Sequence, residues 1–349
     1  GGGPYWCGFF VQAPWRTYIH YNDPRLIEKY YSQMKEWFKY VDKYTVDGLL
    51  KRWPDTKYRD WYLGDWLAPM GVDAGNQASV DLVSNCFISE CLSTMYKTAI
   101  TLGKREEAEE FAIRREKLNK LIHQTFYRAD EGIYSTGSQL DMCYPMLVGV
   151  VPDSLYNKVK ENVVMMTEEK HKGHIAVGLV GVPILTEWAV RNKQVDFFYQ
   201  MMKKRDYPGY LYMIDHGATA TWEYWSGERS RVHNCYNGIG TWFYQAVGGI
   251  RLDEAKPGYR HFYVDPQIPN GVIWAKVTKE SPYGTIAVNW KLKDDNQLNL
   301  QLTVPAGTTA TVCIPNNAVS CKKNKKKVSV KERTVDVEAG HYDFLFNLK

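Results

Sequence analysis

Residues 23–44 read DPRLIEKYYSQMKEWFKYVDKY, and this stretch decides the fold class. Its apolar residues recur at the three- and four-residue spacing of one helix face. Asp23 fits the N-cap position, and Pro24 fits the first helical position, where its missing N–H costs nothing. The stretch therefore predicts an amphipathic helix from Pro24 to Tyr44 that buries one side against other helices.

The chain downstream of this helix repeats the same texture. Helices are expected at residues 79–102, 104–125, 138–148, 152–167, 180–191, 195–204 and 234–247, separated by short turns marked by Gly or Pro. Short turns predict antiparallel helix pairs. The helices share no fixed period, which disfavours a helical solenoid. Residues 48–75 are rich in Trp, Pro, Gly and Asp, so we expect a long ordered loop there, a place where function is often found.

The pattern changes after Gly249. Alternating segments follow, joined by turn residues: VIWAKVTKE, GTIAVNW, LNLQLTV, TATVCI, VSVKE and YDFLFN. They predict an antiparallel β-sandwich that serves as a structural module. We therefore expect a helical domain over residues 1–249 and a β-domain over residues 250–349. The basic run from Lys322 to Lys327 is expected at a solvated hairpin tip rather than in a nucleic-acid site.

Composition narrows the class of protein. The net charge is +5 in 349 residues. No run approaches the roughly 20 apolar residues that a membrane-spanning helix needs. The seven cysteines lack the paired spacing of a zinc site, and Cys86 and Cys91 fit buried positions in helices. Phosphate-loop, dinucleotide, zincin and serine-hydrolase motifs are absent. Aromatic residues make up 14%, with 12 Trp and 25 Tyr, which favours a carbohydrate site.

One stretch combines a carboxylate with aromatic residues in a way that suits catalysis. Residues 217–242 read GATATWEYWSGERSRVHNCYNGIGTW and place Glu223 between Trp222 and Trp225. Indole walls partly desolvate a carboxylate, and a donor such as His233 would hold its anion. Such a group suits general acid or base chemistry. The alternative is that Glu223 caps the helix that follows.

Other segments offer residues that could contact a sugar. In YRDWYLGDWLAPMG, residues 58–71, Asp65 precedes Trp66 and follows Trp61, so its carboxylate could bind hydroxyls of a sugar stacked on a ring. The alternative is an Asx-turn between two core tryptophans. His174 in GHIAVGLVG and Tyr212 in YPGYLYMIDHGAT are further candidates. A lone histidine in such a turn is more often a packing or capping residue than a ligand, and buried tyrosines that satisfy backbone groups explain the tyrosine run equally well.

The chain resembles glycoside hydrolase family 78, the α-L-rhamnosidases, through many motifs in order. They are PYWCGFFVQAPWRTYIHYNDPRLIEKYY, DGLLKRW, YLGDWLAP, GHIAVGLVGVPILTEWA, YPGYLYMIDHGATATWEYW, HNCYNGIGTWFYQAVGGIRLDEAKPGYRHFYVDPQ and SPYGTIAVNW. The resemblance implies an (α/α)₆ barrel followed by a C-terminal β-sandwich. It also implies inverting hydrolysis of terminal rhamnosyl residues by two carboxyl groups, roughly 6.5–9.5 Å apart, without a metal or cofactor.

The resemblance assigns roles to residues by motif. The family's G-A-T-T-x-W-E-x-W glutamate, its general base, falls on Glu223, and the following histidine falls on His233. The family's G-D-W-L loop falls on residues 64–67. We expect Asp65 and Trp66 to hold rhamnose, with Trp61, Trp222, Tyr212 and His174 as further contacts. The partner would be a rhamnose-containing glycoside or polysaccharide, and the resemblance suggests a periplasmic or extracellular location.

The sequence departs from the family pattern in two respects. The family's acid lies in a stretch like C-P-x-R-(D)-E-x-L-G-W upstream of P-Y-W, and this sequence begins at P-Y-W; Arg59-Asp60-Trp61 has Trp in place of the acid. Eight or nine barrel helices can be recognised where twelve are expected. We therefore expect the acid and the first helices in an N-terminal part of the same protein. A non-catalytic carbohydrate-binding relative and a barrel glycosidase for another terminal sugar remain alternatives.

Overall fold

The computed structural model describes residues 3–53, 62–69, 77–293 and 296–349. The chain forms two compact units. The first, called the helical unit, contains Gly1–Trp15 and Ile27–Ile239. The second, called the β unit, contains Arg16–Leu26 and Gly240–Lys349. The helical unit holds every described residue that the sequence assigns to a catalytic or sugar-binding role.

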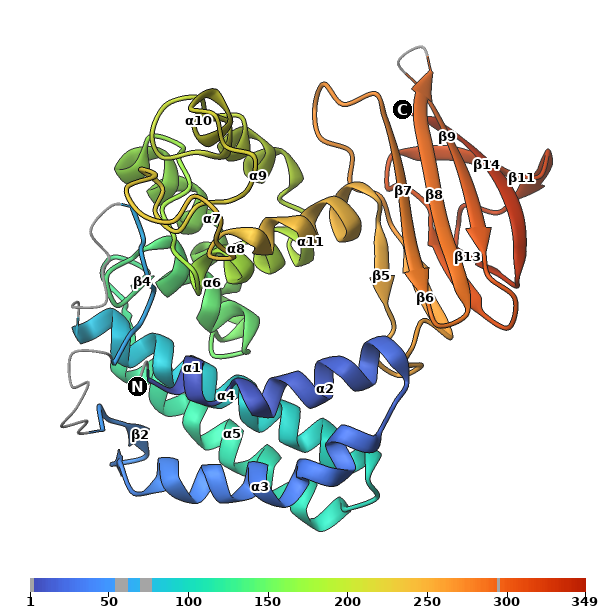
Figure 1. Cartoon of the computed structure of the whole chain (residues 1–349). Coiled ribbons are helices and arrows are strands. Elements are labelled where there is room, and N and C mark those ends of the chain that lie inside the picture. The colour runs from blue at the N-terminus through green and yellow to red at the C-terminus, as the bar shows by residue number, and fades with distance from the viewer. Residues whose placement is uncertain (1–2, 54–61, 70–76, 294–295) are drawn as a thin grey trace. The chain divides into compact units, whose positions relative to one another are not determined.

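The predicted helices are present at nearly the predicted positions (Figure 1). The structure has α1 Pro4–Cys7, α2 Phe9–Tyr21, α3 Arg25–Asp42, α4 Gln77–Thr101, α5 Arg105–Phe126, α6 Gln139–Leu147, α7 Asp153–His171, α8 Gly181–Arg191, α9 Val195–Met202 and α10 Tyr210–Asp215. The side chain of Asp23 accepts the N–H of Arg25 at 3.1 Å, as expected of a residue that begins a helix.

The last predicted helix, 234–247, is present from residue 237 to residue 247, but not as a regular α-helix. The chain instead forms a 3₁₀ turn η1 Asn237–Ile239, one short turn α11 Gly240–Trp242, and a π-helical turn η2 Phe243–Val247. A side chain at Gly238 would lie 3.0 Å from the backbone of Pro183. The close approach to the first turn of α8 therefore requires glycine here, and glycine weakens a regular helix.

Burial separates the helices of the first unit into two layers. Nearly every residue of α6 and α8 is buried, and most of α4 is buried too. By contrast, α3, α5 and α7 bury one side only. The buried helices contact one another in the order α4, α6, α8, and each is paired with the next helix in the chain. The unit is thus a series of hairpins with an inner and an outer helix.

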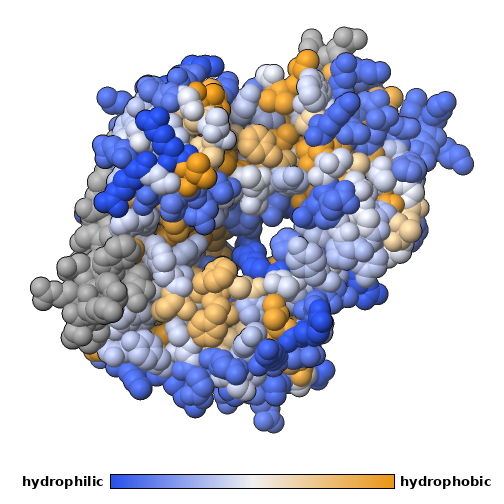
Figure 2. All heavy atoms as spheres, in the orientation of Figure 1, coloured by the Kyte–Doolittle hydropathy of each residue, from blue (hydrophilic) through white to orange (hydrophobic). Residues whose placement is uncertain are grey.

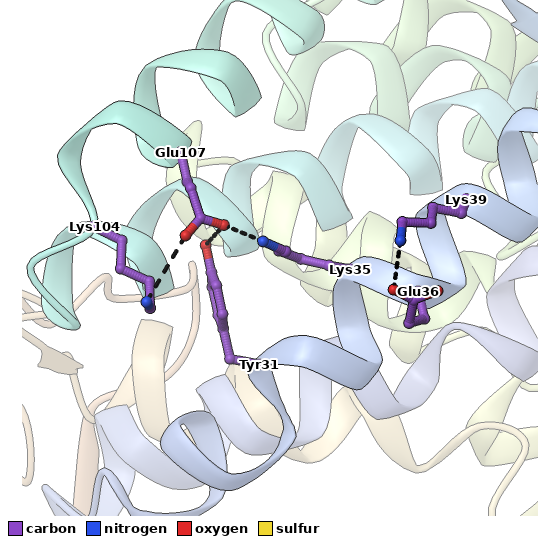
Figure 3. A network of polar contacts seen from close by, with 6 residues as sticks. All are labelled: Tyr31, Lys35, Glu36, Lys39, Lys104 and Glu107. Carbon is purple, nitrogen blue, oxygen red and sulfur yellow. Dashed lines mark hydrogen bonds and ion pairs between the residues drawn. The ribbon is translucent and has the colours of Figure 1, made fainter.

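The outer layer is joined by a polar network between α3 and α5 (Figure 3). The carboxylate of Glu107 accepts hydrogen bonds from Lys35 Nζ at 2.5 Å and from the hydroxyl of Tyr31 at 3.2 Å. Lys104 Nζ lies 3.8 Å from the same carboxylate. The Lys35 ammonium holds the pKa of Glu107 below its ordinary value.

The two ends of the helical layers differ in the length of their connections. The turns from an inner to an outer helix, at 102–104, 148–152 and 192–194, are no longer than five residues. The connections from an outer to an inner helix, at 43–76, 127–138, 172–180 and 203–236, are longer. Because helices in hairpins are antiparallel, the long connections all lie where inner helices begin. This end carries the candidate site.

Two sheets build the second unit. One has strand order β13-β10-β6-β5 and the other β12-β11-β14-β9-β8-β7. The strands are β5 Ile250–Leu252, β6 His261–Val264, β7 Trp274–Ser281, β8 Gly284–Lys293, β9 Gln297–Val304, β10 Thr309–Cys313, β11 Ala318–Lys323, β12 Lys326–Val328, β13 Thr334–Val337 and β14 Gly340–Leu348. Two-residue strands also form two hairpins in the helical unit: β1 Thr45–Val46 with β2 Leu49–Leu50, and β3 Tyr127–Arg128 with β4 Ile133–Tyr134.

Pairing within the β unit is antiparallel except between β6 and β10, which run parallel. The basic run forms the hairpin of β11 and β12, with Asn324 and Lys325 at its tip, as predicted. The predicted strand VSVKE, residues 328–332, is wrong: pairing ends at Val328, and the next strand is β13.

Surface character agrees with the composition. Polar residues cover most of the face shown in Figure 2, and hydrophobic residues appear there as separate patches. Among the described residues, no helix has the length and apolarity needed to cross a membrane. Cys86 and Cys91 are fully buried in α4, as predicted.

Candidate active site

Glu223 lies on an irregular hairpin in the connection before the last inner helix. The N–H of Glu223 donates to the carbonyl of Ser230 at 2.8 Å, and the N–H of His233 donates to the carbonyl of Thr221 at 2.8 Å. The side chain of Glu223 is half-buried. Its carboxylate has no hydrogen bond or ion pair with any other residue that the structure describes. Such a carboxylate is available to a water molecule or a substrate.

His233 lies across the hairpin from Glu223 and is held by its own backbone neighbourhood. Its Nδ1 accepts the N–H of Cys235 at 3.0 Å. A nitrogen that accepts cannot carry the proton, so in the neutral ring Nε2 carries it and can donate. The described contacts include no hydrogen bond between His233 and Glu223, and the expected support of one by the other stays a prediction.

Asp65 is 2% exposed and makes three backbone contacts. Its Oδ2 accepts the N–H of Gly178 at 2.6 Å, and its Oδ1 accepts the N–H groups of Val180 at 3.0 Å and Gly181 at 2.9 Å. Burial raises the pKa of Asp65 to about 7; the three donors oppose this rise, and the charge of Asp141 adds to it. A direct contact of Asp65 with sugar stays a prediction, because both oxygens serve the backbone here.

The tryptophans predicted to contact sugar differ in their exposure. Trp66 is half-buried. Trp222 is 1% exposed, with the guanidinium of Arg231 lying 5.1 Å from the centre of its ring. Trp61 lies outside the described residues. Stacking of a pyranose needs an accessible ring face, so among the described pair Trp66 fits that role better than Trp222.

His174 is buried in the connection from α7 to α8. Its Nδ1 lies 3.0 Å from the carbonyl oxygen of Pro208, and its Nε2 lies 3.2 Å from a carboxylate oxygen of Asp206. Both nitrogens therefore have partners within the chain. These contacts tie two of the long connections together, and a direct contact of His174 with substrate stays a prediction.

Tyr212 belongs to a group of aromatic side chains near the surface on α10. Its ring lies 4.1 Å from that of His216 and 5.6 Å from that of Tyr207. Tyr212 is half-buried, whereas His216 and Tyr207 are exposed. The three rings together offer an accessible aromatic surface, which is consistent with the predicted sugar contact of Tyr212.

The charges of both carboxylates, Glu223 and Asp65, act on the thiol of Cys235. Burial raises the pKa of the Cys235 thiol to about 12, and the charges of Glu223 and Asp65 act in the same direction. Residues 65, 223 and 235 are far apart in the sequence. The 43–76 and 203–236 connections meet through a hydrogen bond: the hydroxyl of Tyr236 donates to the carbonyl of Leu67 at 3.0 Å.

A groove in the helical unit is lined by other residues. It has a volume of about 560 Å³ and lies between α4, α5 and the 148–152 turn. Arg115 and Asn119 in its wall donate to the carbonyl of Val148, at the end of the short helix α6. None of the predicted site residues lines it. Nor do the described residues include any cluster of three His, Cys, Asp or Glu that could hold a metal ion.

Comparison with known protein families shows to which family the chain belongs. Residues 1–247 match the bacterial alpha-L-rhamnosidase 6 hairpin glycosidase domain, and residues 249–329 match the bacterial alpha-L-rhamnosidase C-terminal domain. The chain belongs to the bacterial α-L-rhamnosidase family. The predicted fold class, a helical hairpin barrel followed by a β-rich domain, is thereby confirmed.

Relatives of this family cover nearly the whole chain. The chain is 26% identical to an alpha-L-rhamnosidase of Alteromonas sp. (strain LOR) over 97% of its length, and 27% identical to one of Formosa agariphila over 97%. It spans 37% and 38% of the lengths of these relatives.

Solved rhamnosidase structures have the same fold. The structure of the enzyme from Dictyoglomus thermophilum aligns with a TM-score of 0.88 at 22% identity, over 99% of this chain and 40% of that one. The enzyme from Streptomyces avermitilis, complexed with L-rhamnose, aligns with a TM-score of 0.84 at 22% identity, over 96% of this chain and 32% of that one.

Sequence reasoning missed the residues that join the loops of this rhamnosidase-family site. Tyr236 donates from its hydroxyl to the carbonyl of Leu67 at 3.0 Å and stacks on Trp225, with ring centres 4.0 Å apart. One signal was available: Gly178 and Gly181 stand three residues apart at the start of a helix, a spacing typical of a close approach by another backbone.

Proposed function

We propose that this protein hydrolyses terminal α-L-rhamnosyl residues of glycosides or polysaccharides with inversion of configuration, and that Glu223 is its general base. The observation that carries the assignment is the half-buried carboxylate of Glu223, to which no described residue bonds, within a chain of the rhamnosidase family. A base must reach the proton that it removes, and a carboxylate already engaged by donors cannot do so.

The described residues have different roles at the scissile bond. Glu223 removes a proton from the attacking water as the bond from the sugar to the leaving group breaks. The Nε2–H of His233 is free to donate to the carboxylate or to the water, because Nδ1 is occupied by the N–H of Cys235. The half-buried ring of Trp66 offers an apolar face for the sugar.

We further propose that the general acid is supplied from outside this chain. In support, Asp65 is occupied by three N–H donors, and the curated relatives are more than twice as long as the chain. An inverting enzyme places its acid on the opposite face of the sugar, roughly 6.5–9.5 Å from the base.

The test uses a substrate that needs no acid. A 2,4-dinitrophenyl α-L-rhamnopyranoside releases a stable phenolate, so its hydrolysis by this chain depends on the base alone. We expect β-L-rhamnose as the first product by NMR, and a rate roughly 10²- to 10⁴-fold lower in Glu223→Gln. Glu228→Gln, an exposed change on the same hairpin, should keep the wild-type rate. Release of α-L-rhamnose, or an unchanged rate in Glu223→Gln, would contradict the proposal.

Sugar binding separates a hydrolase from a relative that only binds. Calorimetric titration with L-rhamnose measures affinity for the product without any chemistry. Binding without release of dinitrophenolate would favour a carbohydrate-binding protein. If the chain neither binds nor hydrolyses, the rhamnoside function is wrong for these residues.

A further inference from the structure

The buried carboxylate of Asp65 acts on the beginning of an inner helix. Val180 and Gly181 are the N-cap and first residue of α8, and Gly178 stands just before them. The first N–H groups of a helix have no partner within the helix, and its dipole favours a negative charge at that end. Asp65 fills this need from a connection more than 100 residues away in the sequence.

The backbones of the two connections are in direct contact at the same place. The N–H of Leu179 donates to the carbonyl of Trp66 at 2.8 Å. A Cβ atom at Gly178 would lie 2.0 Å from that carbonyl oxygen, and one at Gly181 would lie 2.7 Å from the Asp65 carboxylate. Gly178 is therefore required by the approach of Trp66, and Gly181 by the approach of Asp65 together with Val177.

A third connection contacts both of these connections. The indole N–H of Trp225 donates to the carbonyl of Val177 at 2.9 Å. Trp225 stacks on Tyr236, and the Tyr236 hydroxyl donates to the carbonyl of Leu67. The contacts thus run from Asp65 through the α8 turn, Val177, Trp225 and Tyr236 to Leu67, next but one to Asp65. We call these residues the Asp65 ring.

We propose that Asp65 is a positioning residue, and that the Asp65 ring fixes the hairpin of Glu223 relative to Trp66. Trp225 is the member of the Asp65 ring that lies on that hairpin, and it is two residues from Glu223. The proposal rests on the function proposed above for its meaning, because only there is Glu223 the base. The ring itself is a set of contacts that can be tested without any substrate.

A carboxylate is needed at this position because three N–H groups converge on two oxygens. In Asp65→Asn one oxygen becomes an NH₂ group, which faces at least one of these donors without accepting from it. Asp141 is a matched control. It is also fully buried. Its Oδ1 accepts the hydroxyl of Ser79 at 2.7 Å, and its Oδ2 accepts both the hydroxyl of Thr136 at 2.6 Å and the N–H of Thr136 at 3.1 Å. The Ser79 hydroxyl can reverse its role and accept from an amide, so in Asp141→Asn the NH₂ group can face Ser79 while the amide oxygen still accepts from Thr136.

The closing experiment measures hydrogen–deuterium exchange of this chain at pH 8, with mass spectrometry of peptides covering 174–182 and 222–236. We expect Asp65→Asn to exchange at least about 10-fold faster than wild type in both peptides, because exchange follows local opening. Asp141→Asn should match wild type in both. Faster exchange confined to 174–182 would mean that Asp65 only caps α8, and would overturn the proposal.

A second variant covers a failure of Asp65→Asn to fold. Trp225→Phe keeps an aromatic ring and removes the bond to Val177, so it should speed exchange in 174–182 although residue 225 lies outside that peptide. The double variant should be no faster in 222–236 than the faster single one; additive effects would contradict a shared ring.

Titration with L-rhamnose then connects the ring to function. Affinity should fall about 10-fold or more in Asp65→Asn and stay at the wild-type value in Asp141→Asn. A wild-type chain that neither binds L-rhamnose nor hydrolyses the dinitrophenyl rhamnoside contradicts the proposed function, while the exchange data still decide the ring. If exchange increases in both peptides but affinity is unchanged, the ring exists without positioning the site, and the proposal is wrong.

Discussion

The segments 62–69 and 221–236 look alike in sequence and behave in opposite ways in the structure. Each places an acidic residue beside tryptophan in a glycine-containing loop. Asp65 is 2% exposed and accepts three backbone N–H groups. Glu223 is half-buried, and no described residue bonds to its carboxylate. The hydrogen-bond partners of a carboxylate in the folded chain, rather than its neighbours in sequence, distinguish a structural carboxylate from one that is available for a reaction.

Glu223→Gln should show the largest effect and should separate activity from stability. Loss of the base is expected to slow hydrolysis of the dinitrophenyl rhamnoside roughly 10²- to 10⁴-fold. The free energy of unfolding should change by less than about 0.5 kcal/mol, because no described contact is lost. Urea denaturation followed by tryptophan fluorescence measures this second quantity. A destabilisation of several kcal/mol would show that Glu223 holds the fold and would end the contrast with Asp65.

The pH dependence of stability tests the contrast between Asp65 and Glu223 at Asp65. Its pKa is raised to about 7 in the folded protein by burial, against an ordinary value of 3.8, so between these values the folded state binds the proton and the unfolded state does not. This contribution to stability is therefore fully present below about pH 4 and is lost as pH rises through 7. At 1.4 kcal/mol per pKa unit, the loss approaches about 4 kcal/mol.

The measurement is the difference in unfolding free energy between wild type and Asp65→Asn at pH 4 and pH 8. The groups whose charges act with or on Asp65 are Asp141, Cys235 and Tyr236, and all three are present in both proteins. Wild type should lose stability relative to the variant as pH rises. A relative gain would mean that the three N–H donors outweigh burial and that the carboxylate is ionised throughout.

Gly178→Ala tests the close contact of the two connections. The added methyl group would overlap the carbonyl oxygen of Trp66, so the backbone must move. We expect a destabilisation of roughly 1–3 kcal/mol, as for other overpacked sites, and weaker binding of L-rhamnose. Gly217→Ala is a useful control for the loss of glycine, since no atom lies within 4 Å of the added carbon; its positive φ gives it a strain of its own. An equal effect of both variants on rhamnose affinity would argue against the contact.

Helices marked by turn residues could be predicted from the sequence, and helices that carry a conflicting signal could not. The bounds of α4 and α8 were predicted within two residues, because apolar spacing and turn signals agree there. The helix α2 was not predicted, since Pro14 lies inside it. VSVKE alternates as a strand does, yet pairing stops at Val328 because register depends on the partner strand, which the sequence of one segment does not contain.

The candidate site could be located from the sequence, but the tasks of its residues could not be separated. Aromatic and acidic residues in long connections indicated segments that do meet, as the hydrogen bond from Tyr236 to Leu67 shows. The sequence did not show how many hydrogen-bond partners each of these side chains has in the folded chain. The three donors to Asp65 lie more than 100 residues away, and both nitrogens of His174 are used by residues more than 30 positions downstream. Such contacts depend on the fold as a whole.

Tyr236→Phe should have the smallest effect, and it tests whether the Asp65 ring needs to be closed. The change removes only the hydroxyl that donates to the carbonyl of Leu67 and keeps the stack on Trp225. Loss of one such hydrogen bond costs about 1 kcal/mol, which urea denaturation can resolve. If the ring fixes Glu223, the affinity for L-rhamnose should fall about 2- to 5-fold, less than in Asp65→Asn, because the α8 turn is still held. Unchanged affinity with the expected loss of stability would show that Asp65 and Trp225 suffice, and that the ring works as an open chain of contacts.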